Sequence, residues 1–131
     1  MAPIPGLLAD ADFSTRQFYV VKLVGTTGVE WEVTPTTAIT DRAIGIIQND
    51  PSTGQAAQVA GLGEIAKAQY GGTVTNGQWL GFGTDARVVA SADPTTASGA
   101  LRTIIAQALE DGATGENHYV LVLSPWQATT T

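Results

Sequence analysis

The sequence predicts an all-β fold, a small β-barrel or β-sandwich with an extended N-terminal arm and at most one short helix. Short β-branched and aromatic segments recur along the 131 residues, and turn residues separate them about every 8 to 12 positions. One segment alternates strictly between apolar and charged residues. A chain of this length fits one domain. We expect an arm over residues 1–12, a β domain over 13–125 and a C-terminal tail over 126–131.

The first twelve residues predict an arm because Pro3 and Pro5 flank Ile4 and favour extended backbone. Leu7 and Leu8 follow without any periodic context. One interpretation is a disordered terminus. The other is an arm that docks on a neighbouring subunit and buries its three large aliphatic side chains.

The first half of the domain predicts a hairpin followed by two further strand regions. Residues 15–25 are rich in β-branched and aromatic residues, and residues 29–33 read Val-Glu-Trp-Glu-Val, a half-buried strand. Residues 43–50 predict a buried strand that Asn-Asp-Pro terminates. Residues 55–72 alternate again. Their Ala content permits a helix, but each glycine in the segment would cost a helix about 1 kcal/mol, which favours strand.

The second half predicts further hairpins. Asn76-Gly77 is the strongest hairpin signal, because both central residues of a type I′ turn need positive φ. Residues 78–91 predict two short strands around a Gly-Thr-Asp turn. Residues 92–100 predict a loop, and residues 101–112 fit either a helix or a strand. Residues 117–125 predict a last strand that ends at Pro125.

Composition excludes several functional classes. The net charge is −6, and no cluster of basic residues is present, so we expect neither nucleic acid nor an anionic membrane as partner. No segment approaches the roughly 20 apolar residues of a membrane span, and the N-terminus does not have the pattern of a signal peptide. With no cysteine and one histidine, one chain offers no thiolate or multi-His metal site. We expect no metal and no cofactor.

The chemical motifs in the chain are weak. Residues 61–66 and 81–86 both read G-x-G-x-x-A, but neither has the strand–turn–helix context of a dinucleotide site. His118 lies in a predicted strand without a nucleophile elbow. Two carboxylate pairs have a simple structural interpretation. We expect Glu30 and Glu32 to lie on a solvated strand face, and Glu110 and Asp111 to lie in a solvated turn. We expect Asp41, Asp50 and Asp93 to stabilise loops. These patterns predict no catalytic residue.

The three tryptophans are the largest apolar side chains. We expect Trp31 and Trp79 to lie in the core. Trp126 follows a proline near the C-terminus, where its large area and N–H donor suit a contact between subunits. The predicted partner contacts are Pro3, Ile4, Pro5, Leu7, Leu8 and Trp126.

The order of segments over residues 44–91 resembles the phage capsid cement family, also described as head decoration proteins. The resemblance is carried by Gly45-Ile46, Thr53-Gly54-Gln55, Gly63-Glu64-Ile65-Ala66, and Asn76-Gly77-Gln78-Trp79 leading to Asp85-Ala86-Arg87. Residues 104–125 are similar to the terminal strand pair of the family, with Ala106 where glycine is commoner. The resemblance implies a β-barrel or sandwich, with residues 101–112 in strands. It also implies trimers on the capsid exterior and no enzymatic activity.

The expected function is therefore that of a cement protein on the outer surface of a phage capsid, made in the bacterial cytoplasm. Its expected partners are the major capsid protein and further copies of itself in a homotrimer. Three alternatives stay open. One is a tail or fibre protein of the same virion. Another is a carbohydrate-binding sandwich with Trp31, Trp79 and Tyr70 as a platform. The third is an enzyme that uses His118 with an acidic partner.

Overall fold

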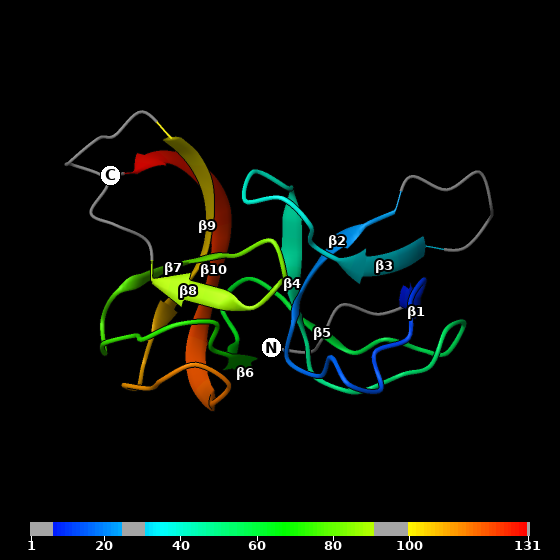
Figure 1. Ribbon diagram of the computed structural model, residues 1–131. Helices are drawn as coiled ribbons and strands as arrows, with labels where there is room; N and C mark the ends of the chain where they lie inside the picture. The colour runs from blue at the N-terminus through cyan, green and yellow to red at the C-terminus, as the bar shows by residue number, and fades with distance from the viewer. Residues whose placement is uncertain (1–6, 25–30, 91–99, 131) are drawn as a thin grey trace.

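The computed structural model describes residues 7–24, 31–90 and 100–130, with only the backbone described for residues 100–102 and 126–130. Its regular elements are ten strands in two sheets, without a helix in the described ranges (Figure 1). Accordingly, no helix in these ranges is long and apolar enough to cross a membrane. The all-β prediction is confirmed, and the ambiguous residues 101–112 fall largely in a strand.

Sheet 1 has the strand order β1-β3-β2-β4-β5. Strands β2 and β3 form the antiparallel pair predicted from residues 15–33, and β1 runs parallel to β3. The bounds are β1 Leu7–Ala9, β2 Val20–Leu23, β3 Trp31–Pro35, β4 Ala43–Ile47 and β5 Val59–Ala60.

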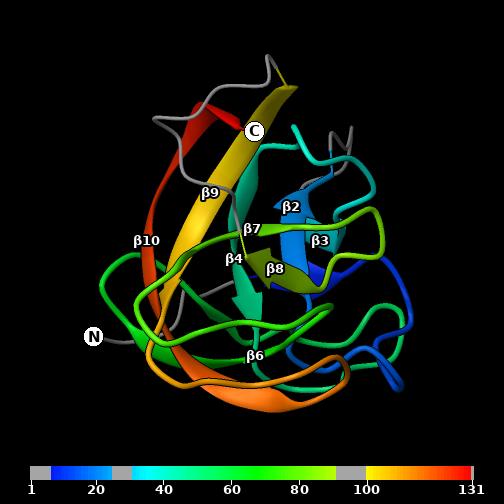
Figure 2. The same cartoon turned by 60° about the vertical axis from the view of Figure 1, so that its left-hand side comes forward.

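Sheet 2 has the order β6-β10-β9-β7-β8. The long strands β9 and β10 curve together along one side of the molecule (Figure 2). A parallel bridge between Tyr70 and Val88 connects the end of β6 to β8, so the two edges of this curled sheet approach each other. The bounds are β6 Ile65–Gln69, β7 Trp79–Phe82, β8 Val88–Ala90, β9 Ala100–Ala108 and β10 Asn117–Thr130.

Two apolar clusters lie on opposite faces of sheet 1. Val20 and Ile46 face the first cluster, which includes side chains of sheet 2, whereas Val21 and Ile47 face the second. All four side chains are fully buried. A strand that is buried on both faces has a nearly continuous run of apolar residues in its sequence. This explains the apolar run at the start of residues 43–50. The first cluster includes Tyr70, Leu80 and Phe82, and the second includes Phe13, Val21 and Ile47.

The prediction that Trp31 and Trp79 lie in the core is wrong. Trp31 is 66% exposed and Trp79 is 39% exposed. Trp31 is the first residue of β3, at the rim of the face on which Val33 is fully buried. Trp79 points outward from β7, because its neighbour Leu80 fills the first cluster. The alternation of residues along a strand shows which side each ring faces. Whether that side is buried depends on the rest of the fold.

The turn at Asn76-Gly77 also differs from the prediction of a type I′ hairpin. Only Gly77 has a positive φ, at 90°, and the Gln78 N–H donates to the Thr75 carbonyl. This is the pattern of a type II turn. The flanking strands β6 and β7 do not pair with each other. Instead, the Gly77 N–H donates to the Ala108 carbonyl, so the turn is held by the end of β9.

Strand β10 does not end at Pro125, contrary to the prediction. Its pairing with β9 shifts register between Val122 and Trp126 and then continues to Thr130. A proline fits such an irregularity because its missing N–H removes no ladder hydrogen bond there. The predicted tail is therefore strand over residues 126–130.

The predicted arm is partly a strand of the domain itself. Leu7 is only 4% exposed and belongs to the second cluster. Its carbonyl accepts the Ala57 N–H, and the Ala9 N–H donates to the Gln55 carbonyl. The expected boundary after residue 12 therefore falls inside the fold. Pro3, Ile4 and Pro5 lie outside the described residues.

Candidate interaction surface

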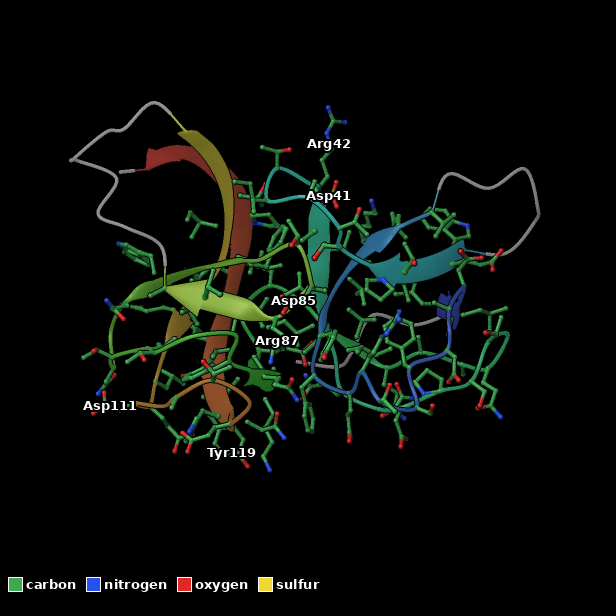
Figure 3. All side chains as sticks on the ribbon, in the orientation of Figure 1. Asp41, Arg42, Asp85, Arg87, Asp111 and Tyr119 are labelled. Atoms are coloured by element: carbon green, nitrogen blue, oxygen red, sulfur yellow. The ribbon has the colours of Figure 1, made fainter. Side chains whose placement is uncertain are left out.

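The side of sheet 2 that faces away from the first cluster carries large apolar side chains. On β6, Ala66 and Ala68 point into the cluster, so Ile65 and Lys67 point outward. The same alternation sends Tyr119 of β10 outward. The exposed fractions are 66% for Ile65 and 47% for Tyr119. Figure 3 shows Tyr119 at the periphery of the β10 end of the molecule.

The strand register joins these side chains into one stripe. Leu121 is paired with Ile65 on β6 and with Gln107 on β9, and Gln107 is paired with Trp79 on β7. Residues paired across a sheet point to the same face. One row therefore crosses four strands. Tyr119, paired with Lys67, begins the adjacent row. We call Ile65, Lys67, Trp79, Tyr119 and Leu121 the outer patch.

Lys67 is the one charged residue among the described strand positions on this face. The outward positions include Ile65, Lys67, Gln69, Trp79, Gly81, Val89, Gln107, Asn117, Tyr119, Leu121 and Leu123. The chain as a whole carries twelve acidic and six basic residues. An exposed sheet face that is apolar and nearly uncharged is typical of a protein interface rather than of a free surface.

The Lys67 ammonium lies between two aromatic rings. Its Nζ is 5.5 Å from the centroid of the Tyr119 ring and 6.0 Å from that of Phe18. Both distances fall within the range of a cation–π contact. Lys67 makes no ion pair with a described residue, although its charge is near enough to Glu110 to help lower the pKa of that carboxyl.

Phe18 has an unusual backbone, with φ of 70°. A left-handed conformation costs a residue with a Cβ about 1–2 kcal/mol. Here it is stabilised by both sheets, because the Phe18 N–H donates to the Ile47 carbonyl and the Phe18 carbonyl accepts the Gln69 N–H. This geometry brings the Phe18 ring to Lys67. No local sequence pattern indicates this conformation.

His118 lies at the rim of the same sheet and is held by two carboxylates. Its Nε2 is 3.0 Å from Glu116 Oε1, and its Nδ1 is 3.4 Å from Glu110 Oε1. The hydrogen bond to Glu116 raises the pKa of His118; partial burial opposes this, and Glu110 reinforces it. The ring packs on Tyr70, with centroids 5.0 Å apart. Together, His118, Glu110, Glu116 and Tyr70 connect residues 110–118 to the core.

Tyr70 and Gly112 complete the surroundings of His118. Tyr70 is fully buried, and its hydroxyl donates to the Glu110 carbonyl. Burial, with smaller effects of Glu110 and Asp111, raises the pKa of Tyr70 to about 12. A Cβ built on Gly112 would overlap the His118 ring. The site is packed, and among the described residues no three His, Cys, Asp or Glu side chains could hold a metal ion.

A hollow of about 320 Å³ lies between the end of β3 and the β7–β8 turn. Asp85 forms an ion pair with Arg87 at 2.7 Å, and Figure 3 shows both side chains between the two sheets. Thr36 is 1% exposed, and its hydroxyl lacks a hydrogen-bond partner among the described residues. That hydroxyl is too enclosed for a ligand to reach. The lining residues are Arg16, Tyr19, Pro35, Thr36, Thr37, Thr84 and Asp85.

Asp41 acts as the loop residue that the sequence predicted. Its carboxylate accepts the Thr37 and Ala38 N–H groups and lies 3.1 Å from Lys22 Nζ. Burial opposes the charged form, but these hydrogen bonds and the ammonium outweigh it and lower the pKa of Asp41. Figure 3 shows Asp41 above β4, beside Arg42.

Among the predicted contact residues, only Leu7 and Leu8 have described side chains, and both lie in β1. Leu7 is buried in β1 and Leu8 is half-buried. Trp126 pairs with Ile104 through the backbone of β10, and its side chain is not described. The outer patch was missed, although the alternation of Ile65 and Lys67 with two buried alanines was visible in the sequence. The two G-x-G-x-x-A segments lie in strands and turns.

Neither a family model nor a curated protein matches the chain. Among solved structures, the chain is similar to the N base of the head fiber protein gp8.5 of bacteriophage phi29. The TM-score is 0.65 at 14% sequence identity, and the match covers 95% of this chain and 94% of that chain. The two proteins share a fold over almost their whole length.

Proposed function

We propose that this chain is a structural protein of a bacteriophage virion that binds the outer surface of the head as a cement or decoration protein. The observation that carries the proposal is the fold shared with a phage head fiber base over 95% of the chain. The resemblance of residues 44–91 to the capsid cement family supports the same class of function. In this proposal the chain is not an enzyme and needs no cofactor.

The proposed partners are the major capsid protein and further copies of this chain in a homotrimer. Packed DNA presses outward on a phage head and pulls its subunits apart. A trimer that contacts several subunits gains from effective concentration, which multiplies weak contacts by factors of about 10² to 10⁴. The exposed, nearly uncharged face of sheet 2 supports a role in contacts rather than in turnover.

A fibre base of the same virion is the second candidate, because the similar solved structure belongs to a head fiber. Both candidates place the chain on the head, but they differ in what the chain does there. A cement protein stabilises the shell. A fibre base attaches another component and leaves the shell unchanged.

The experiment adds purified full-length protein to DNA-filled heads that lack it. Binding is measured by co-sedimentation, and shell stability by DNA release on heating. We expect binding together with a higher temperature of DNA release. Binding without any change in DNA release supports a fibre base instead. Absence of binding at micromolar protein contradicts both candidates.

The carbohydrate-binding alternative loses its predicted platform. Tyr70 is fully buried, and Trp31 and Trp79 belong to different sheets. Stacking on a sugar needs exposed rings that share one surface. The three residues therefore do not form the platform that the sequence allowed.

A further inference from the structure

We propose that the outer patch is the face that sits on the head, and that it recognises an apolar protein surface in which an acidic side chain meets Lys67. This inference rests on the proposed function, and it names the contact face and the chemistry of the partner. It differs from the sequence prediction, which placed the contact in the N-terminal arm and at Trp126.

The first argument is the apolar content of the patch. Ile65, Tyr119 and Trp79 are 66%, 47% and 39% exposed. They belong to two adjacent rows fixed by strand pairing, so a partner surface that follows the curvature of sheet 2 contacts them together. Aromatic side chains contribute strongly to interfaces because they bury large areas with few rotatable bonds.

The restricted position of the Lys67 ammonium also supports the inference. Its backbone is bonded to the Gln48 side chain through both the N–H and the carbonyl. The flanking rings of Phe18 and Tyr119 limit the positions of its ammonium. A cation that is already ordered, and that has no described carboxylate within ion-pair distance, loses little entropy when a carboxylate of the partner approaches. An acidic side chain at the centre of the partner surface therefore completes the contact.

A twofold pair of copies of this chain does not fit the outer patch. Two copies that met face to face about a twofold axis would bring both Lys67 ammoniums into the same contact. Like charges in an interface are unfavourable. The charge pattern fits a different protein, which we take to be the shell of the head.

The test measures binding of full-length variants to heads that lack the protein, by co-sedimentation over a concentration series. Lys67→Glu and Ile65→Ser each change an exposed or half-exposed side chain of the patch. The matched control for Lys67→Glu is Arg42→Glu, which changes an exposed charge in a loop outside the patch. The matched control for Ile65→Ser is Trp31→Ser, because Trp31 lies on sheet 1 and is as exposed as Ile65. Tyr119→Ser is a second patch variant. Circular dichroism melting verifies that each variant is folded.

We expect each patch variant to weaken binding at least tenfold and each control to change it less than twofold. If unmodified protein binds heads and the patch variants bind equally well, the inference is wrong while the proposed function stands. If unmodified protein does not bind, the proposed function itself fails. If Ile65→Ser instead converts an oligomer to monomers in sedimentation velocity, the patch is a self-association surface and the inference is overturned.

Discussion

The side-chain amide of Gln48 pairs with the backbone of Lys67 as another strand would. Its Nε2 donates to the Lys67 carbonyl at 2.9 Å, and its Oε1 accepts the Lys67 N–H at 3.1 Å. Gln48 follows β4 of sheet 1, whereas Lys67 belongs to the edge strand β6 of sheet 2. One side chain therefore connects the two sheets and, together with the Phe18 carbonyl that accepts the Gln69 N–H, covers part of an edge that could pair with other chains.

The Gln48→Ala variant tests this connection. It removes the two hydrogen bonds to Lys67, each worth about 1 kcal/mol, together with longer ones to the Ile46 and Ile47 carbonyls. We therefore expect the free energy of unfolding to fall by at least about 2 kcal/mol. Urea denaturation followed by tryptophan fluorescence measures it. Gln58→Ala is the control, because the Gln58 side chain is exposed, and its effect should stay within about 0.5 kcal/mol. Equal stability of the two variants would contradict the connecting role.

The N-terminal strand gives a second prediction. Leu7 is 4% exposed in the second cluster, so Leu7→Ala should lower the free energy of unfolding by about 2–3 kcal/mol. Leu8 is half-buried, and Leu8→Ala should have a smaller effect. Denaturation curves of the two variants decide between a strand of the domain and a free arm. A free arm predicts no loss of stability for either variant.

A third prediction concerns the close approach of β4 and β5. A Cβ built on Gly45 would overlap the Ala60 carbonyl and the Val59 side chain. Gly45→Ala should therefore destabilise the protein by about 1–3 kcal/mol through overpacking. Gly72 has open space at the corresponding position, so Gly72→Ala is the matched control. Thermal unfolding monitored by circular dichroism compares them, and a similar melting temperature for both would refute the close approach.

The fourth prediction is a pH dependence that originates at His118. Its pKa is raised in the folded state by Glu116 and Glu110. The stabilisation of the fold by protonated His118 is therefore complete below the pKa of histidine in the unfolded chain, about 6.5. It is lost as the pH rises through the pKa of His118 in the folded protein. The adjacent Tyr70 stays neutral there because its pKa is about 12. Lys67 and Asp111 are the other charged groups nearby.

We expect the melting temperature to fall between pH 6.5 and 8.5 in the unmodified protein, and to change less in His118→Gln. The carboxylates of Glu110 and Glu116 affect stability at acidic pH instead. The pKa values of Glu110 and Glu116 are lowered, chiefly by the Tyr119 N–H and by His118 respectively. Their stabilisation is present above the unfolded pKa and is lost as the pH falls below about 4.5. Identical pH profiles for both proteins would show that His118 is not the origin.

Local sequence patterns predicted the strands because alternation and turn residues act over a few positions. The pair β2–β3, the buried β4 and the β7–β8 hairpin were all visible in this way. The alternation of Ile65 and Lys67 with Ala66 and Ala68 was equally clear. These patterns show which side chains share a face, and they show it reliably because the period of a strand is two residues.

Only the tertiary structure decided which faces are covered and which segments pair. Trp31 shares a face with the buried Val33 yet is exposed, because the covering layer ends before it. Asn76-Gly77 forms a turn without a hairpin, since the partners of β6 and β7 come from distant β10 and β9. The outer patch likewise depends on the register of four strands. Burial and pairing are non-local properties, so the sequence determined the all-β class and the tertiary structure determined the candidate surface.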